Sequence, residues 1–170
     1  DFENMALAAR LEAYGDRIDV MDERDPAFSA YDGPRYPPRS TLAFHEFHVH
    51  RTPLQLLHER AMERYCPAAI YVCDSDAWPV RPGWDVRMMS SLEEGHKLVG
   101  VWRDEMTSVI QPFIHASGMA FPADLVEQLK LRLDYKPEHD GEDTLSNFTR
   151  AVQARFGLAA IEPLERSNAH

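Results

Sequence analysis

Two aspartates, Asp74 and Asp76, follow a short apolar run at 68–73 that is rich in residues favouring β-strands. In an open α/β sheet, ligands bind outside the carboxyl ends of the strands, so acids at this position face a crevice instead of the core. Two carboxylates this close repel each other unless a cation lies between them, and hard divalent cations prefer oxygen ligands. The pattern predicts a site for a divalent cation, and a solvated turn after the strand is the alternative.

The composition is that of an ordinary globular protein and predicts one domain over 1–170. The 170 residues are 27% charged and 44% hydrophobic, and no apolar run approaches the roughly 18 to 20 residues of a membrane span. The formal net charge of −10 argues against a protein that coats nucleic acid by neutralising phosphates. Cys66 and Cys73, the two cysteines, do not make a disulfide framework, so we expect reduced thiols and a cytoplasmic location.

The hydrophobic spacing predicts alternating helices and strands that would position these acids. Because helix and strand alternate, we expect an α/β fold with a parallel sheet whose first strand precedes Asp1. The helix expected at 53–65 carries Leu54, Leu57, Ala61 and Met62 on one side. The expected helices are 4–14, 53–65, 122–133 and 143–156, with a helix or turn at 85–94, and the expected strands are 17–21, 68–73, 97–102, 113–121 and a last one after Gly157.

Several motifs occur in an order that resembles one family. They are Asp74-Ser75-Asp76, Pro-Val-Arg-Pro-Gly-Trp at 79–84, a small-residue run at 117–121, Gly-Glu-Asp-Thr-Leu at 141–145 followed by Arg150, and the terminal His170. This order resembles the nucleotide-sugar-dependent glycosyltransferases of the GT-A fold, most closely the inverting family-two type. The resemblance implies a three-layer α/β/α sandwich with a mostly parallel central sheet.

The same resemblance implies a metal and a donor substrate. In such enzymes the two acids, here Asp74 and Asp76, hold Mn²⁺ or Mg²⁺ against the diphosphate of a nucleotide sugar, with a UDP-sugar as the expected donor. The ion neutralises the charge that builds on the departing diphosphate. His170 resembles the histidine that supplies a third protein ligand to the metal, and a frayed chain end is the alternative.

The resemblance also places residues on the acceptor side, where a saccharide or another molecule offers a hydroxyl. Asp143 corresponds to the base that takes the acceptor's proton, and Asp140 and the adjacent Glu142 are the fallback candidates. An acid in the first turn of a helix is also favoured by the helix dipole alone. His115 and Gly118 border the acceptor in this reading, while a buried, hydrogen-bonded histidine is the alternative for His115.

A second histidine-rich segment, His45-Glu46-Phe47-His48-Val49-His50, precedes the helix before the two acids. On a strand His48 and His50 share one face, which leaves too few ligands for a catalytic zinc site. The glycosyltransferase reading instead implies that His50 or Arg51 contacts the donor phosphates or base, and a surface or packing role is the third possibility.

Two other functions compete with the transferase. One is a phosphohydrolase that uses Asp74 as its nucleophile, although Trp78 stands where that motif has Thr or Val. The other is a domain that binds a nucleotide-sugar-like partner without catalysis. Hydrolysis or transfer of a nucleotide sugar that depends on a divalent ion would separate the transferase from a pure binder.

Overall fold

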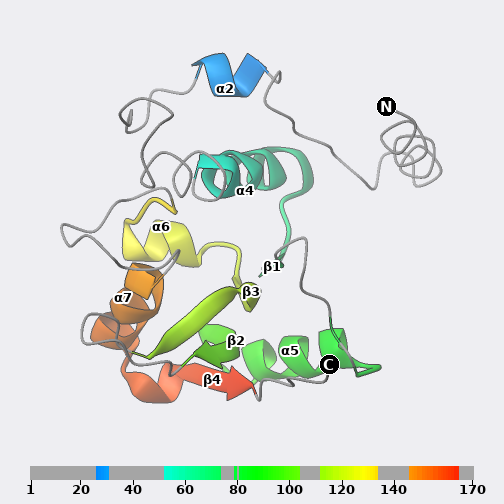
Figure 1. The fold of residues 1–170 in the computed structure, drawn as a ribbon, viewed down its shortest axis with the longest axis vertical. Helices are drawn as coiled ribbons and strands as arrows, with labels where there is room; N and C mark the ends of the chain where they lie inside the picture. The colour runs from blue at the N-terminus through cyan, green and yellow to red at the C-terminus, as the bar shows by residue number, and fades with distance from the viewer. Residues whose placement is uncertain are drawn as a thin grey trace. The chain divides into compact units, whose positions relative to one another are not determined.

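The computed structural model describes residues 26–30, 52–73, 79, 81–103, 112–133 and 146–164. The chain divides into two compact units, Asp1–Asp32 and Gly33–His170. In the first unit the structure describes one short helix, α2 (Pro26–Ala30). All other described elements belong to the second unit (Figure 1). The prediction of one domain over 1–170 stays a prediction.

The described part of the second unit holds a mixed sheet with the strand order β1-β3-β2-β4. The strands are β1 (Ala69–Val72), β2 (Leu98–Arg103), β3 (Phe113–Pro122) and β4 (Ile161–Leu164). β1, β2 and β4 run in one direction, and β3 runs against them between β1 and β2. The α/β class is therefore confirmed, with one antiparallel strand inside the sheet.

The short connection between β2 and β3 explains the antiparallel strand. Residues 104–112 join the two strands, whereas a crossover to a parallel neighbour needs a dozen or more residues. β1 and β2 keep the same direction because helix α5 (Trp84–Glu93) lies between them in the chain, as in a βαβ unit. The predicted strands at 68–73, 97–102 and 113–121 are confirmed, as is the last strand after Gly157.

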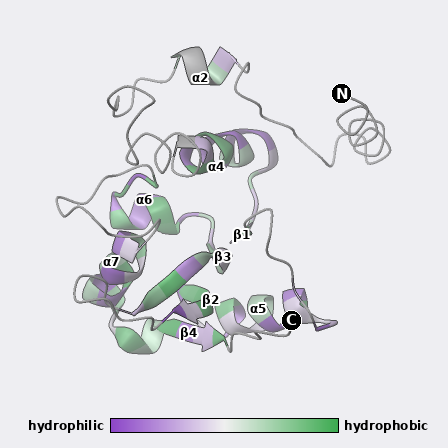
Figure 2. Cartoon of the chain, in the orientation of Figure 1, coloured by the Kyte–Doolittle hydropathy of each residue, from purple (hydrophilic) through white to green (hydrophobic). Residues whose placement is uncertain are grey.

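Helices cover both faces of the sheet. On one face Met88 of α5 packs with Val99 and Ala120. On the other face α6 (Leu125–Leu129) and α7 (Ser146–Phe156) contribute to a larger core. That core contains Val72, Leu98, Ile114, Ala116, Met119, Phe121, Leu125, Val126, Leu133, Phe148, Val152 and Ile161. In Figure 2, β2 and β3 are largely hydrophobic, whereas α4 (Thr52–Tyr65) and α7 carry both hydrophobic and hydrophilic residues.

A β-bulge interrupts the pairing of β2 with β3. The partners are Gly100 with Met119 before it and Trp102 with Ile114 after it, so Val101 faces several residues of β3. Because side chains alternate along a strand, the extra residues change which positions face the core. Ile114 and Met119 both pack in the larger core although they are an odd number of residues apart.

The helix predicted at 122–133 is wrong in its length. α6 spans only Leu125–Leu129 and ends where Lys130 takes a left-handed conformation. Pro122 still belongs to β3, and the backbone N–H of Ala123 donates to the carbonyl of Ala68 at 3.1 Å. The first residues of the predicted helix are therefore paired with the sheet and are not helical. The apolar residues of that segment nevertheless enter the core, as expected.

The helix predicted at 53–65 is confirmed as α4, and the helix or turn expected at 85–94 is the helix α5. Of the helix predicted at 143–156, the part from Ser146 onward is confirmed as α7. The helix predicted at 4–14 and the strand predicted at 17–21 lie outside the described residues. No helix in the described ranges is long and apolar enough to cross a membrane.

Candidate functional site

Most of the predicted site residues lie outside the part of the chain that the structure describes. These residues are His50, Arg51, Asp74, Asp76, Glu142, Asp143 and His170. Their roles in metal, donor and acceptor binding therefore stay predictions. His115 and Gly118 are described, and the elements that lead into the other motifs are described as well.

Described strands that lead into predicted motifs end at one edge of the sheet. Because β1, β2 and β4 are parallel in direction, their carboxyl ends open on the same edge, and the antiparallel β3 begins there. Asp74 follows β1 after a single intervening residue, the exposed Cys73. The segment 165–170 follows β4 directly. This edge is where a ligand of an open α/β sheet is expected.

The first turns of α7 are fixed beside the same edge. The backbone N–H of Ile114, the second residue of β3, donates to the hydroxyl of Thr149 at 3.0 Å. Ile114 is fully buried and Thr149 is 1% exposed. Ser146, the first residue of α7, is also buried, and its hydroxyl has no hydrogen-bond partner among the described residues. The chain thus enters α7 next to the start of β3, three residues after Asp143.

His115 forms a local hydrogen-bonded pair with Ser117. The backbone N–H of Ser117 donates to the Nδ1 of His115 at 3.1 Å, and the Ser117 hydroxyl lies 2.7 Å from the same atom. Since a backbone N–H only donates, Nδ1 is the acceptor and the ring proton is on Nε2. The ring is half-buried and lies 5.8 Å from the ring of Phe113. His115 is therefore hydrogen-bonded, as its alternative expected, but it is half-buried and not buried.

Gly118 is buried in the bulge, where the backbones of β2 and β3 approach each other closely. A Cβ at Gly118 would lie 2.9 Å from Cγ2 of Val101. A Cβ at Gly100 would lie 2.2 Å from the carbonyl oxygen of Gly118. The neighbour that requires glycine at 118 is thus β2. Approach of an acceptor or donor to Gly118 stays a prediction.

An aromatic pair supports the strand that leads to Asp74. The rings of Tyr71 and Trp84 lie 4.6 Å apart, and both pack against the smaller core under α5. Burial, and then the hydrogen bond with the Cys73 thiol, raises the pKa of Tyr71 above its usual value of 10. Its phenol is therefore neutral near pH 7. Trp84, the first residue of α5, therefore has a packing role in this core.

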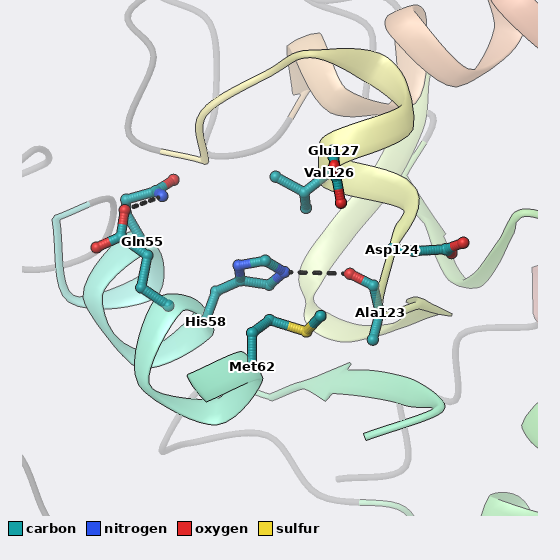
Figure 3. Close-up of a pocket in the computed structure, with 8 residues that line it drawn as sticks. Gln55, His58, Met62, Ala123, Asp124, Val126 and Glu127 are labelled. Atoms are coloured by element: carbon teal, nitrogen blue, oxygen red, sulfur yellow. Dashed lines mark hydrogen bonds between the residues drawn. The ribbon is translucent and has the colours of Figure 1, made fainter. Parts of the chain in front are cut away.

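A groove of about 340 Å³ lies between α4 and the turn that leads from β3 into α6 (Figure 3). The α4 wall consists of Gln55, His58, Glu59 and Met62, and the opposite wall of Ala123, Asp124, Val126 and Glu127. Figure 3 shows His58 and Met62 reaching from α4 toward Ala123. The volume is within the range of small-ligand pockets, about 300 to 1,000 Å³.

His58 lines this groove with a neutral imidazole ring. Its Nε2 lies 3.4 Å from the carbonyl of Ala123, and because a carbonyl only accepts, Nε2 donates. Burial lowers the pKa of His58 below 6.5, opposed by that hydrogen bond and by the charge of Glu59. The neutral ring therefore presents the lone pair of Nδ1. Nδ1 has no hydrogen-bond partner in the described part of the chain.

The amino-acid sequence did not predict this groove. Its signal is a helical stripe in α4, since Gln55, His58, Glu59 and Met62 stand at spacings of three and four residues. The stripe is mostly polar, so it was indistinguishable from a solvated helix face. The opposite wall comes directly after β3, and it lies beside α4 because β3 runs antiparallel to β1. The sequence pattern did not predict that direction.

Within the described ranges, no group of three or more His, Cys, Asp or Glu side chains could hold a metal ion. The predicted metal ligands lie outside those ranges. Comparison of the chain with known protein families, with curated proteins and with solved structures gave no match.

Proposed function

We propose that this chain is a metal-dependent glycosyltransferase of the GT-A type. It would move a sugar from a nucleoside-diphosphate donor to an acceptor hydroxyl with inversion at the anomeric carbon. The fold is a three-layer sandwich in this proposal, and the described sheet with helices on both faces supports it. The donor is a nucleotide sugar, with a UDP-sugar as the first to test.

One observation carries the proposal. Four chain segments with predicted chemistry connect to the same edge of one sheet, where ligands of such sheets bind. Asp74 and Asp76 follow the carboxyl end of β1, and 165–170 follows that of β4. His115 lies near the start of β3, and α7 begins beside Ile114.

Chain length is compatible with a shared site. Three strand spacings of about 4.8 Å separate β1 from β4, which is about 14 Å. Six residues after Leu164 can span up to about 20 Å when extended, so His170 can reach the acids after β1. Asp143 stands three residues before Ser146, so its Cα is within about 11 Å of the start of α7.

The roles follow from the chemistry of each side chain. Asp74 and Asp76 offer carboxylate oxygens, which suit Mn²⁺ or Mg²⁺, and His170 adds a nitrogen ligand that suits Mn²⁺. When bound, the ion neutralises charge on the departing diphosphate. Asp143 accepts the proton of the attacking hydroxyl, with Glu142 next to it. His50 and Arg51 contact the donor phosphates, and His115 with Gly118 lines the acceptor side.

The experiment is a titration of the protein with UDP, and in parallel GDP, in the presence and absence of Mn²⁺, followed by calorimetry. We expect binding of one nucleotide that depends on Mn²⁺. Asp76→Ala should abolish that binding without changing the urea unfolding midpoint, because its carboxylate faces the ligand instead of the core. Asp74→Ala should weaken binding by a smaller factor.

Asp85→Ala is the matched control, since Asp85 is an exposed acid in the first turn of α5. Unchanged nucleotide affinity in Asp76→Ala would exclude the metal role of this motif. Nucleotide binding without release of free sugar or of a glycosylated product from any UDP-sugar or GDP-sugar would favour a binding domain over a transferase.

A further inference from the structure

The polar side chains that line the groove between α4 and α6 are mostly hydrogen-bond acceptors. The rim carries three exposed carboxylates, Glu59, Asp124 and Glu127, and the neutral His58 adds the lone pair of Nδ1. The amide of Gln55 donates one of its two N–H groups to Glu59 at 2.7 Å. A ligand that supplies donors and positive charge therefore matches the carboxylates.

The floor of the groove is apolar. Ala123 is 3% exposed and Val126 is 6% exposed, and Met62 lies beside His58 with its flexible side chain (Figure 3). An aliphatic stem can pack on this floor while its charged end meets the carboxylates at the rim. Methionine adapts to ligands of different shape more readily than a branched side chain does.

A side chain on a larger partner fits the groove better than a small free cation. The groove lies at the surface, where Glu59, Asp124 and Glu127 are exposed, so it covers only part of what it holds, and the remaining affinity must come from contacts outside it. Arginine has five donors in a fixed fork and a weakly hydrated head, which suits several separate acceptors on a partly apolar surface. The net charge of −10 would also attract a basic partner over long range.

We propose that the groove between α4 and α6 is a docking site for an arginine side chain of a basic partner protein. The aliphatic part of the arginine packs on Met62 and Val126. Its guanidinium donates to the carboxylates of Glu59 and Glu127 and to Nδ1 of His58.

This docking site is separate from the proposed transferase site. Ala123 pairs with Ala68, next to the amino end of β1, whereas Asp74 follows the carboxyl end of that strand. The groove thus lies at the opposite edge of the sheet. The inference does not depend on the proposed function, and its failure would leave that function untouched.

The test is a chemical-shift titration of the ¹⁵N-labelled chain with N-acetyl-glycyl-arginyl-glycine amide. The matched probe replaces arginine with citrulline, which has the same shape without the charge. We expect saturable shifts at Gln55, His58, Val126 and Glu127 with the arginine peptide only. Glu127→Gln should weaken binding by about two- to five-fold, as for a partly exposed ion pair, and 0.5 M salt should weaken it further.

Glu93→Gln is the control, because Glu93 is an exposed acid on α5, which packs on the other face of the sheet. It should bind the peptide with unchanged affinity. If Glu127→Gln does not fold, Glu59→Gln replaces it, since a glutamine at 59 can still accept the hydrogen bond from Gln55.

Three results would overturn the inference. The first is equal binding of the arginine and citrulline peptides. The second is a loss of affinity in Glu93→Gln as large as in Glu127→Gln, which would indicate a diffuse attraction to acidic surface. The third is tighter binding of free n-propylguanidinium than of the peptide, which would assign the groove to a small cation.

Discussion

The hydroxyl of Thr149 in α7 accepts a hydrogen bond from the backbone N–H of Ile114 in β3 across 3.0 Å, and both residues are buried. The bulge leaves this end of β3 with irregular pairing to β2, so a side chain supplies an acceptor inside the core. The bond ties the first part of α7 to the strand that carries His115. It therefore connects the position of the helix to the edge of the sheet where we expect the predicted motifs to lie.

Thr149→Val should lower the free energy of unfolding by about 1 to 3 kcal/mol, because the Ile114 N–H would be buried without an acceptor. Thr149→Ser keeps the hydroxyl and is the matched control, with a smaller loss from the missing methyl group. Urea unfolding followed by circular dichroism measures both. Equal stability of the valine variant and the wild type would show that another group satisfies this N–H.

Gly100→Ala should destabilise the fold by overpacking, which typically costs about 1 to 3 kcal/mol. The added Cβ would lie 2.2 Å from the Gly118 carbonyl and 2.9 Å from the Met119 Cα, and neither backbone atom can move aside alone. Gly83→Asn is the comparison, since Gly83 has a φ of 75° but open space around it. Asparagine tolerates that conformation. A thermal melt that ranks the two variants in the reverse order would contradict the close approach at the bulge.

The stability of the protein should fall as the pH drops below about 6.5, in part through His58. Burial lowers the pKa of His58 in the folded chain below its unfolded value of 6.5. Between the two pKa values the unfolded chain binds the proton more readily, so each decrease in pH favours unfolding. Well above pH 6.5 the ring is neutral in both states and contributes no slope.

His58→Gln removes this proton uptake and should flatten the pH dependence of the urea midpoint between pH 7.5 and 5.5. The other histidines remain in the variant, so the difference between the two proteins isolates His58. Identical slopes would mean that the ring gains its proton in the folded state as easily as in the unfolded one.

Asp143→Asn should leave donor binding intact and reduce the transfer rate by about 10² to 10⁴, since an amide cannot take the proton of the acceptor hydroxyl. Single-turnover assays with the donor identified by titration would measure the rate, and calorimetry would measure donor affinity. If the variant keeps more than a tenth of the rate, Asp143 is not the base, and Asp140 is the next candidate. Loss of the rate together with unfolding would instead indicate a helix-capping role.

The periodicity of the sequence predicted which segments are helices and which are strands over much of the described chain. α4, α5 and β1 to β4 appear where apolar spacing placed them, because that spacing decides which side of an element can be buried. The strand before Asp74 is one of these elements. The motif residues themselves are predicted from their chemistry and from a family resemblance, and most lie outside the described ranges.

Burial on α4 could not be read from its apolar residues alone. Leu57 belongs to the predicted apolar side, yet it is 41% exposed, while Gln55 is 5% exposed. Gln55 is buried because its Oε1 accepts from the backbone N–H of Leu133 at 2.7 Å and its amide donates to Glu59. A polar side chain with both ends satisfied can occupy an interior position, and its partner is 78 residues away in the chain.

The sequence by itself determined the strand that ends before Asp74, the helices on either side of it and the apolar residues that form the core, since these depend on local spacing and on hydrophobicity. Only the tertiary structure decided that β3 inserts between β1 and β2, that its bulge requires Gly100, and that α6 stops at Leu129. Pairing between strands and contacts across the core join residues far apart in the chain, and local periodicity carries no information about which distant backbone groups will meet.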